Sequence, residues 1–177
     1  KYFGGTTIIN GGTTLNYNIT VSDTLPSRIS GSGTFNKTGS GTLSVTGDQS
    51  GFSGIANING GILNFNKTTT TDKFFAGITN VNANSTLEYT TGINDTLNGK
   101  INGEGTFKKE GTATLYLSGN NSGFSGQTII DAGSLVFNKN TINDTYFGGT
   151  TIINGNGTLE YNLSAADTIN GNVSGSG

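Results

Sequence analysis

The chain has 177 residues, of which 31% are apolar and 30 are Gly; its formal charge is −2, and it contains no Cys, His, Met or Trp. Without Cys or His, we exclude disulfides, thiolate metal sites and catalysis by an imidazole or thiol. No basic stripe suggests a nucleic-acid partner, and no long apolar run or basic amphipathic helix suggests insertion into a membrane.

A 72-residue repeat, without insertion or deletion, is the most regular feature of the chain. Gly33-Thr34-Phe35 returns as Gly105-Thr106-Phe107, and Gly51-Phe52-Ser53-Gly54 returns as Gly123-Phe124-Ser125-Gly126. A fixed period of this kind is typical of a solenoid, in which each unit packs mainly on its neighbours, and it argues against disorder. We expect 1–177 to be one continuous segment of a longer array, because it begins and ends inside a unit.

Short strands are expected along the whole chain, since no segment has the 3.6-residue periodicity of a helix. A Leu followed two residues later by an aromatic or aliphatic residue marks seven of them: 15–17, 43–45, 63–65, 87–89, 115–117, 135–137 and 159–161. Alternation places these two residues on the inner face and the residue between them on the outer face. Clusters of Gly and Asn between the strands supply turns.

The spacing of these strands predicts the fold. The steps between the leading Leu residues are 28, 20 and 24, in repeating order, so each 72-residue unit is expected to contain three coils of those lengths. Such coils predict a right-handed parallel β-helix of about seven coils, stacked about 4.8 Å apart. An antiparallel β-roll or sandwich would account for the strands but not for the recurring steps.

The residues from Gly105 to Leu135 resemble the passenger-associated repeat of bacterial autotransporters. They follow its pattern G-T-L-x-K-x-G-x-G-T-L-x-L-x-G-x-N-x-[YF]-x-G-x-T-x-[IV]-x-x-G-x-L, with Lys109 at the Lys position. Residues 33–65 match as well, with departures at Ile55-Ala56 and Asp48-Gln49. The remaining segments match one another but match the family only loosely.

This resemblance implies a β-helical segment of a large surface protein that a Gram-negative bacterium exports. It also implies a C-terminal membrane barrel outside 1–177 and, frequently, a role in adhesion. The expected partners are a host or bacterial cell-surface protein or glycan and the neighbouring repeats of the same parent chain.

Candidate catalytic residues are few. Asp23, Asp95 and Asp167 share one repeat column and, at three coils per repeat, are expected about 14 Å apart, whereas paired glycosidase carboxylates need about 5 to 9.5 Å. We therefore interpret them as turn or backbone caps. The nonapeptide of calcium β-rolls, the EF-hand loop and the phosphate-binding loop are absent from the sequence, so no catalytic, cofactor or metal residue is predicted.

Possible surface-recognition residues are Tyr116, Arg28, Lys37, Lys109, Lys67 and Lys139. Tyr116 lies between two inward Leu residues, so we expect it to face outward, where its counterpart is Ser44. Arg28 is the only Arg. The lysines recur in repeat columns, and we expect them to be solvated at strand edges or turns; a repeated contact with an acidic polymer is the alternative. Residues 67–73 are expected to form a loop.

Three functions remain open: a stalk or adhesive segment of a surface protein, a fragment of a polysaccharide-acting enzyme, and an ice-binding or self-assembling filament. An enzyme would need a cleft with clustered carboxylates. An ice-binding face would need outward Thr on every coil, and the outward Asn16, Glu88 and Glu160 interrupt such a plane. The first function is our prediction, with no enzymatic activity.

Overall fold

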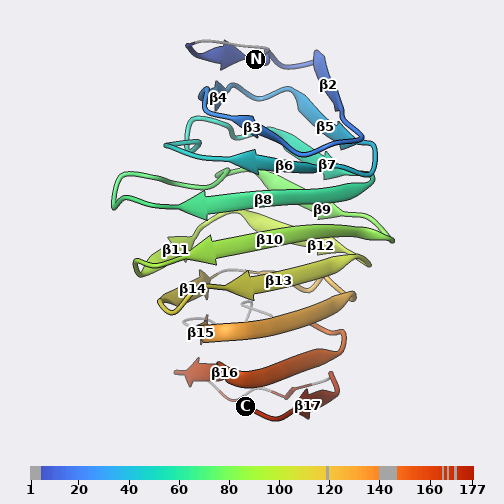
Figure 1. Ribbon diagram of the computed structural model, residues 1–177. Coiled ribbons are helices and arrows are strands. Elements are labelled where there is room, and N and C mark those ends of the chain that lie inside the picture. The colour runs from blue at the N-terminus through green and yellow to red at the C-terminus, as the bar shows by residue number, and fades with distance from the viewer. Residues whose placement is uncertain (1–4, 119, 140–146, 165, 167, 170) are drawn as a thin grey trace.

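The structure is a computed structural model that describes all residues except 1–4, 119, 140–146, 165, 167 and 170, and the side chain of Lys139. It is a stack of about seven turns in which every pair of strands is parallel (Figure 1). No helix occurs within the described residues. Because the front strands run leftward while the chain descends, the winding is right-handed. The predicted parallel β-helix is thus confirmed, and parallel pairing excludes the antiparallel alternative.

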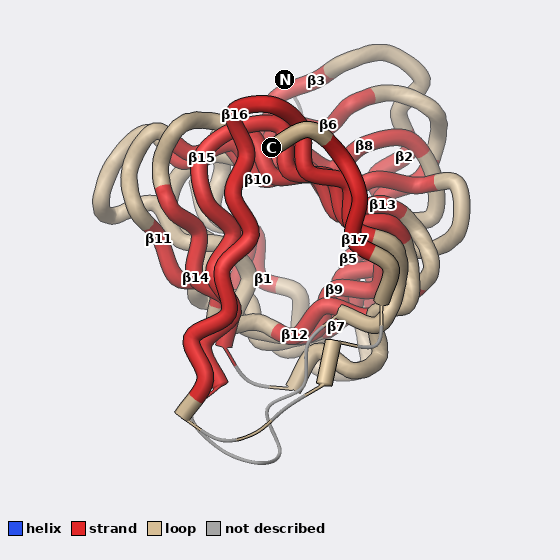
Figure 2. Tube along the Cα trace, turned by 90° about the horizontal axis from the view of Figure 1, so that it is seen from below, coloured by secondary structure: helices blue, strands red, loops and turns tan. Residues whose placement is uncertain are grey.

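Strands lie on three sides of a common interior, with loops at the corners (Figure 2). The first face is a five-stranded sheet: β2 (Thr14–Asn18), β5 (Thr34–Thr38), β7 (Ile55–Ile58), β9 (Ile78–Val81) and β12 (Lys100–Gly103). A ten-stranded sheet spans the other two faces, because the long strands β15 (Gln127–Lys139) and β16 (Thr151–Leu163) continue around the corner between them.

The second face contains the first part of each long strand together with β3 (Asp23–Leu25), β6 (Thr42–Val45), β8 (Gly61–Lys67), β10 (Ser85–Thr91), β13 (Thr106–Glu110) and β17 (Val173–Gly175). The third face contains the remainder of the long strands with β11 (Asp95–Leu97) and β14 (Thr114–Ser118). The pair β1 (Thr7–Ile8) and β4 (Ile29–Ser30) also belongs there, since β4 follows the second face and precedes the first, as β11 does.

Apolar side chains fill the interior because alternate residues of every strand point inward. The five central Leu residues of the predicted strands are fully buried, namely Leu43, Leu63, Leu87, Leu115 and Leu135. Leu15 and Leu159, nearer the two ends of the stack, are partly buried. Aromatic rings from neighbouring turns contact one another, as in the Phe65–Tyr89 pair with centroids 5.1 Å apart. The predicted inward facing of these strands is therefore confirmed.

The predicted coil lengths need one correction. Leu15 pairs with Phe35 in the next turn and not with Leu43, so the predicted 28-residue coil does not exist. The predicted coils of 20 and 24 residues are confirmed, because Leu43 pairs with Leu63 and Leu63 pairs with Leu87. The sequence reasoning missed the strand at 34–38, whose inward residues are Phe35 and Lys37, because a Lys was not expected inside.

Three turns are therefore shorter than one repeat. Phe35 lies over Ala56, then Thr79, then Ile101, so three turns end at Ile101, whereas one repeat ends at Phe107. The remaining residues of each repeat carry the chain around the corner to the next face. β5 lies on the first face, and its counterpart one repeat later, β13, lies on the second. Likewise β6 lies on the second face and its counterpart β14 on the third. Each repeat is thus rotated about the axis by roughly a third of a turn.

Candidate functional site

Tyr116 and Arg28 are accessible, as predicted. Tyr116 is half-buried on the outer side of β14, with Thr96 and Val136 as its neighbours in the adjacent turns. Arg28 is exposed at a corner and makes an ion pair with Asp48, at 3.5 Å, in which both side chains are more than a third exposed. An exposed pair of this kind adds little stability. Neither residue belongs to an enclosed site.

The predicted exposure of the lysines is wrong for every one whose side chain is described. Lys37 and Lys109 are 0% exposed and Lys67 is 2% exposed. They occupy inward positions of their strands, so none of them can contact an external polymer. Lys139 belongs to β15, but its side chain lies outside the described part of the structure.

Lys37 and Lys109 are buried because each ammonium group binds backbone carbonyls at a corner. The Nζ of Lys37 donates to the carbonyls of Thr38 (3.1 Å), Gly39 (2.9 Å) and Gly60 (2.9 Å). The Nζ of Lys109 donates in the same way to Glu110 (2.8 Å), Gly111 (2.7 Å) and Ala132 (3.1 Å). Since the third carbonyl belongs to the next turn, each Lys joins two turns. We call this arrangement the lysine cap.

The Gly two residues after the Lys explains how the chain forms a lysine cap. Gly39 and Gly111 have φ of 76° and 78°, a region that favours Gly. A Cβ at Gly39 would lie 2.1 Å from the Ile19 carbonyl oxygen of the turn above. The signal in the sequence was therefore Lys-x-Gly, present at the same position of both copies. Burial lowers the pKa of Lys37, and it lowers the pKa of Lys109 to about 8.

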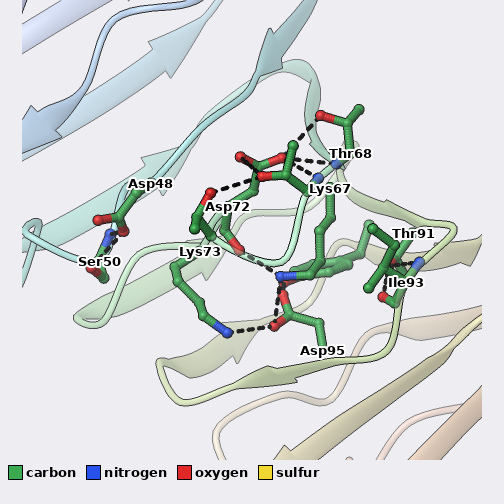
Figure 3. Close-up of polar contacts among 12 residues, drawn as sticks. Asp48, Ser50, Lys67, Thr68, Asp72, Lys73, Thr91, Ile93 and Asp95 are labelled. Atoms are coloured by element: carbon green, nitrogen blue, oxygen red, sulfur yellow. Dashed lines mark hydrogen bonds and ion pairs between the residues drawn. The ribbon is translucent and has the colours of Figure 1, made fainter.

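A second kind of buried lysine, Lys67, is paired with a carboxylate (Figure 3). Its Nζ lies 3.1 Å from Oδ1 of Asp95, and the two side chains are 1% and 0% exposed. Lys73 lies 3.2 Å from the same oxygen, with its side chain 45% exposed. The hydroxyl of Tyr89 donates to the other oxygen, Oδ2, at 2.5 Å. We call Lys67, Lys73, Tyr89 and Asp95 the Asp95 site.

The loop at 68–72, as predicted from the run of Thr residues, leads from Lys67 toward Lys73. Oδ2 of Asp72 accepts hydrogen bonds from the backbone amides of Thr68 and Thr69, both at 2.8 Å. Burial alone would raise the pKa of Asp72, but these bonds lower it overall. The Asp72 carbonyl also accepts a bond from Nζ of Lys67 at 2.6 Å, so the loop is joined to the Asp95 site.

The column of aspartates has a different arrangement from the predicted one. Asp23 lies on the second face and Asp95 on the third, so the rotation of the repeats separates them; Asp167 lies outside the described residues. Asp23 accepts a bond from the Tyr17 hydroxyl at 2.9 Å and one from the Thr24 amide, and these lower its pKa. Both described aspartates therefore hold a Tyr hydroxyl. The predicted capping of a backbone group is observed at Asp23, whose carboxylate accepts the bond from the Thr24 amide.

Asparagines of adjacent turns bond to one another, but the sequence did not locate their ladder on the outside of the first face: Asn16, Asn36, Asn57, Asn80 and Asn102. Each amide nitrogen donates to the side-chain oxygen of the asparagine one turn above, at 2.8 to 3.3 Å. The ladder ends where Gly123 follows Asn102 in the next turn, and Oδ1 of Asn102 is buried there without a protein partner. The uneven spacing of these residues concealed the ladder in the sequence.

The surface formed by the described residues includes two shallow hollows. One, of about 410 Å³, follows the corner where Gly126, Gly149 and Gly171 stack, and the other, of about 250 Å³, lies beside Lys73 and Phe74. Among the residues that the structure describes, no group of three or more Asp, Glu, His or Cys side chains could hold a metal ion. The described part of the chain also holds no helix that is long and apolar enough to cross a membrane.

Comparisons with known proteins place the two lysine caps inside a known repeat. The model of the passenger-associated-transport-repeat family matches residues 35–65 and 107–137, so two segments of the chain are similar to this repeat. The matches cover less than half of the chain and are separated by the 72-residue period. The comparisons with curated proteins and with solved structures found no match.

Proposed function

We propose that the chain, which is a β-solenoid with two passenger-associated transport repeats, is part of the stalk of an autotransporter passenger on the surface of a Gram-negative bacterium. A C-terminal membrane barrel elsewhere in the parent chain would anchor it. The observation that carries the proposal is the coincidence of the family repeat with the parallel stack that the described strands form. Backbone hydrogen bonds between all turns make such a stack stiff along its axis.

The rotation of the repeats supports a spacer over a one-sided binding strip. Equivalent outer residues, such as Ser44 on the second face and Tyr116 on the third, point in different directions. A loop that protrudes on one side of the axis in one repeat therefore protrudes on a different side in the next repeat (Figure 2). A partner that contacts one side of the rod would not meet the same residues again until three repeats later.

Catalysis is not part of the proposal. The sequence contains neither His nor Cys, and the two described aspartates of the repeat column lie on different faces. The carboxylate of Asp95 is surrounded by two ammonium groups and a phenol, and it has no exposed surface from which to reach a substrate.

A length experiment on the parent protein tests the spacer. One 72-residue unit, for example 35–106, is duplicated or deleted, and the distance of the passenger tip from the cell surface is measured. One unit contributes about three and a third turns, so the tip should move by roughly 16 Å per unit. An unchanged distance with normal surface display would contradict the proposal.

An adhesive side surface is the second candidate, because Tyr116 places an aromatic ring on the outer side, and aromatic residues are enriched at binding hot spots. The labelled chain is tested for binding to panels of host and bacterial cells. The matched variant is Tyr116→Ser, which restores the residue of the first repeat, and Leu115→Asp is the unfolded control. Binding that needs the fold and falls with Tyr116→Ser supports adhesion to a cell-surface protein or glycan; no binding supports the spacer alone.

A further inference from the structure

We propose that Lys67 and Asp95 are joined by an amide bond that forms spontaneously after folding, which would make the Asp95 site a covalent cross-link between adjacent turns. Two properties distinguish this pair from the other ion pairs. Both side chains are at most 1% exposed, and the amine lies 3.1 Å from a carboxylate oxygen. In contrast, the lysine caps present an equally buried amine to carbonyls alone.

The surroundings of Asp95 supply the groups that such a condensation requires. Two ammonium groups share one carboxylate, so a proton can pass from Lys67 to Asp95 while a second amine still faces the carboxyl group. Lys67 is the amine without access to water, and a neutral Lys amine is a nucleophile toward a carbonyl carbon. Lys73, which reaches solvent, remains the cation that faces Oδ1.

Tyr89 provides the stabilising donor. Its hydroxyl is 2.5 Å from Oδ2, the oxygen that Lys67 and Lys73 leave free. Burial, followed by the bond to Asp95, raises the pKa of this phenol, so it stays protonated and can donate to an oxygen on which charge accumulates. The rings of Phe65 and Phe74 lie 5.1 and 5.9 Å from that of Tyr89, and they keep water from this side of the site.

The reaction balances without an external reagent. Lys67 passes one proton to Oδ1 of Asp95, 3.1 Å away, and its Nζ then forms a bond to Cγ while negative charge moves onto Oδ2, beside Tyr89. The bond from Cγ to Oδ1 then breaks. Oδ1, which already carries the proton from Lys67, takes a second proton from the attacking nitrogen and leaves as water. An ammonium and a carboxylate thus become an amide and a water molecule, with no oxidation or reduction.

The product would close a loop that runs from Lys67, the last residue of β8, to Asp95, the first residue of β11. A cross-link across such a loop restricts the unfolded chain, as a disulfide does, and this chain has no Cys to form one. The same two residue types recur one repeat later as Lys139 and Asp167, which lie outside the described side chains.

Mass spectrometry of the folded full chain tests the cross-link. We expect proteolysis to release a branched peptide that contains Lys67 and Asp95 and is lighter than its two parts by one water molecule. Lys37 and Lys109, buried without a carboxylate, serve as internal controls and should remain unmodified. Peptide mapping shows whether a second loss of water falls on Lys139 and Asp167.

Two variants separate chemistry from folding. Lys67→Arg keeps a cation beside Asp95 but removes the nucleophile, so the peptides should be separate and of full mass although the circular dichroism of the β-solenoid is retained. Tyr89→Phe keeps the packing and removes the donor, so the cross-link should form at least tenfold more slowly during refolding. If the folded unmodified chain, after days at neutral pH, yields only separate peptides of full mass, the pair is an ion pair and the proposal is wrong.

Discussion

β5 and β13 are the same segment of successive repeats, but they lie on different faces with different neighbours. Their inner residues behave in the same way. Phe35 and Phe107 are both fully buried, and Lys37 and Lys109 each bind three carbonyls in the same pattern. Their outer residues differ. Asn36 belongs to the asparagine ladder, whereas its counterpart Lys108 makes ion pairs with Glu110 and Asp131.

The difference shows which contacts recur in every repeat. A lysine cap uses carbonyls within its own strand end and the next turn, so the repeat carries all of its parts. An outer residue contacts whatever the adjacent turns place beside it on that face, and the rotation of the repeats changes those neighbours. Inner positions are therefore expected to control stability and outer positions to vary at little cost.

The largest effect should come from a charge at an inner position. Leu115→Asp buries a carboxylate without a partner, and we expect a loss of about 4 kcal/mol or more in the free energy of unfolding. Tyr116→Asp, on the next residue of the same strand, should cost about 1 kcal/mol or less. Denaturant unfolding followed by circular dichroism measures both. Equal losses would contradict the assignment of inner and outer positions.

A comparison of two adjacent lysines tests the lysine cap. Lys109→Met leaves three part-buried carbonyls without the ammonium, and we expect a loss of about 2 kcal/mol. Lys108→Met removes only part-exposed ion pairs and should cost about 1 kcal/mol or less. The same unfolding measurement applies. If the variant at Lys108 were the more destabilised, the cap would not hold the two turns together.

The pH dependence of stability sharpens the same comparison. The pKa of Lys109 is about 8 in the folded chain and 10.5 without burial, so between these values the unfolded chain binds more protons. Stability due to Lys109 should therefore rise with pH across this window and stay constant below it. We expect the slope to weaken in Lys109→Met and to persist in Lys108→Met, measured by unfolding from pH 7 to 10. Identical slopes in both variants would assign the titration to other groups.

The smallest effect concerns the asparagine ladder. Asn57→Ala removes two amide hydrogen bonds, one to each neighbouring turn, and we expect a loss of about 1 kcal/mol. The control is Asn10→Ala, at an exposed residue outside the ladder, which should change stability by less than about 0.5 kcal/mol. Thermal unfolding of the two variants, measured side by side, gives both losses of stability. A loss at Asn57 no larger than at Asn10 would mean that water replaces the ladder bonds without cost.

The sequence by itself determined the strands that begin with a Leu, their parallel stacking and the facing of residues such as Leu115 and Tyr116, although it missed the strand at 34–38. These features depend on short-range alternation and on a period that is visible in the text, so no knowledge of the neighbouring turn is needed. It also identified the repeat family through motifs of adjacent residues.

Only the tertiary structure decided which residues meet across turns. The charge of Lys37 and Lys109 predicted exposure, because a buried ammonium is costly unless it finds partners, and here the partners are carbonyls of the next turn. Lys67 and Asp95 pair for the same reason, although they belong to different turns and different faces. The rotation of each repeat by one face likewise follows from the register of the turns, because three turns hold fewer residues than one 72-residue repeat.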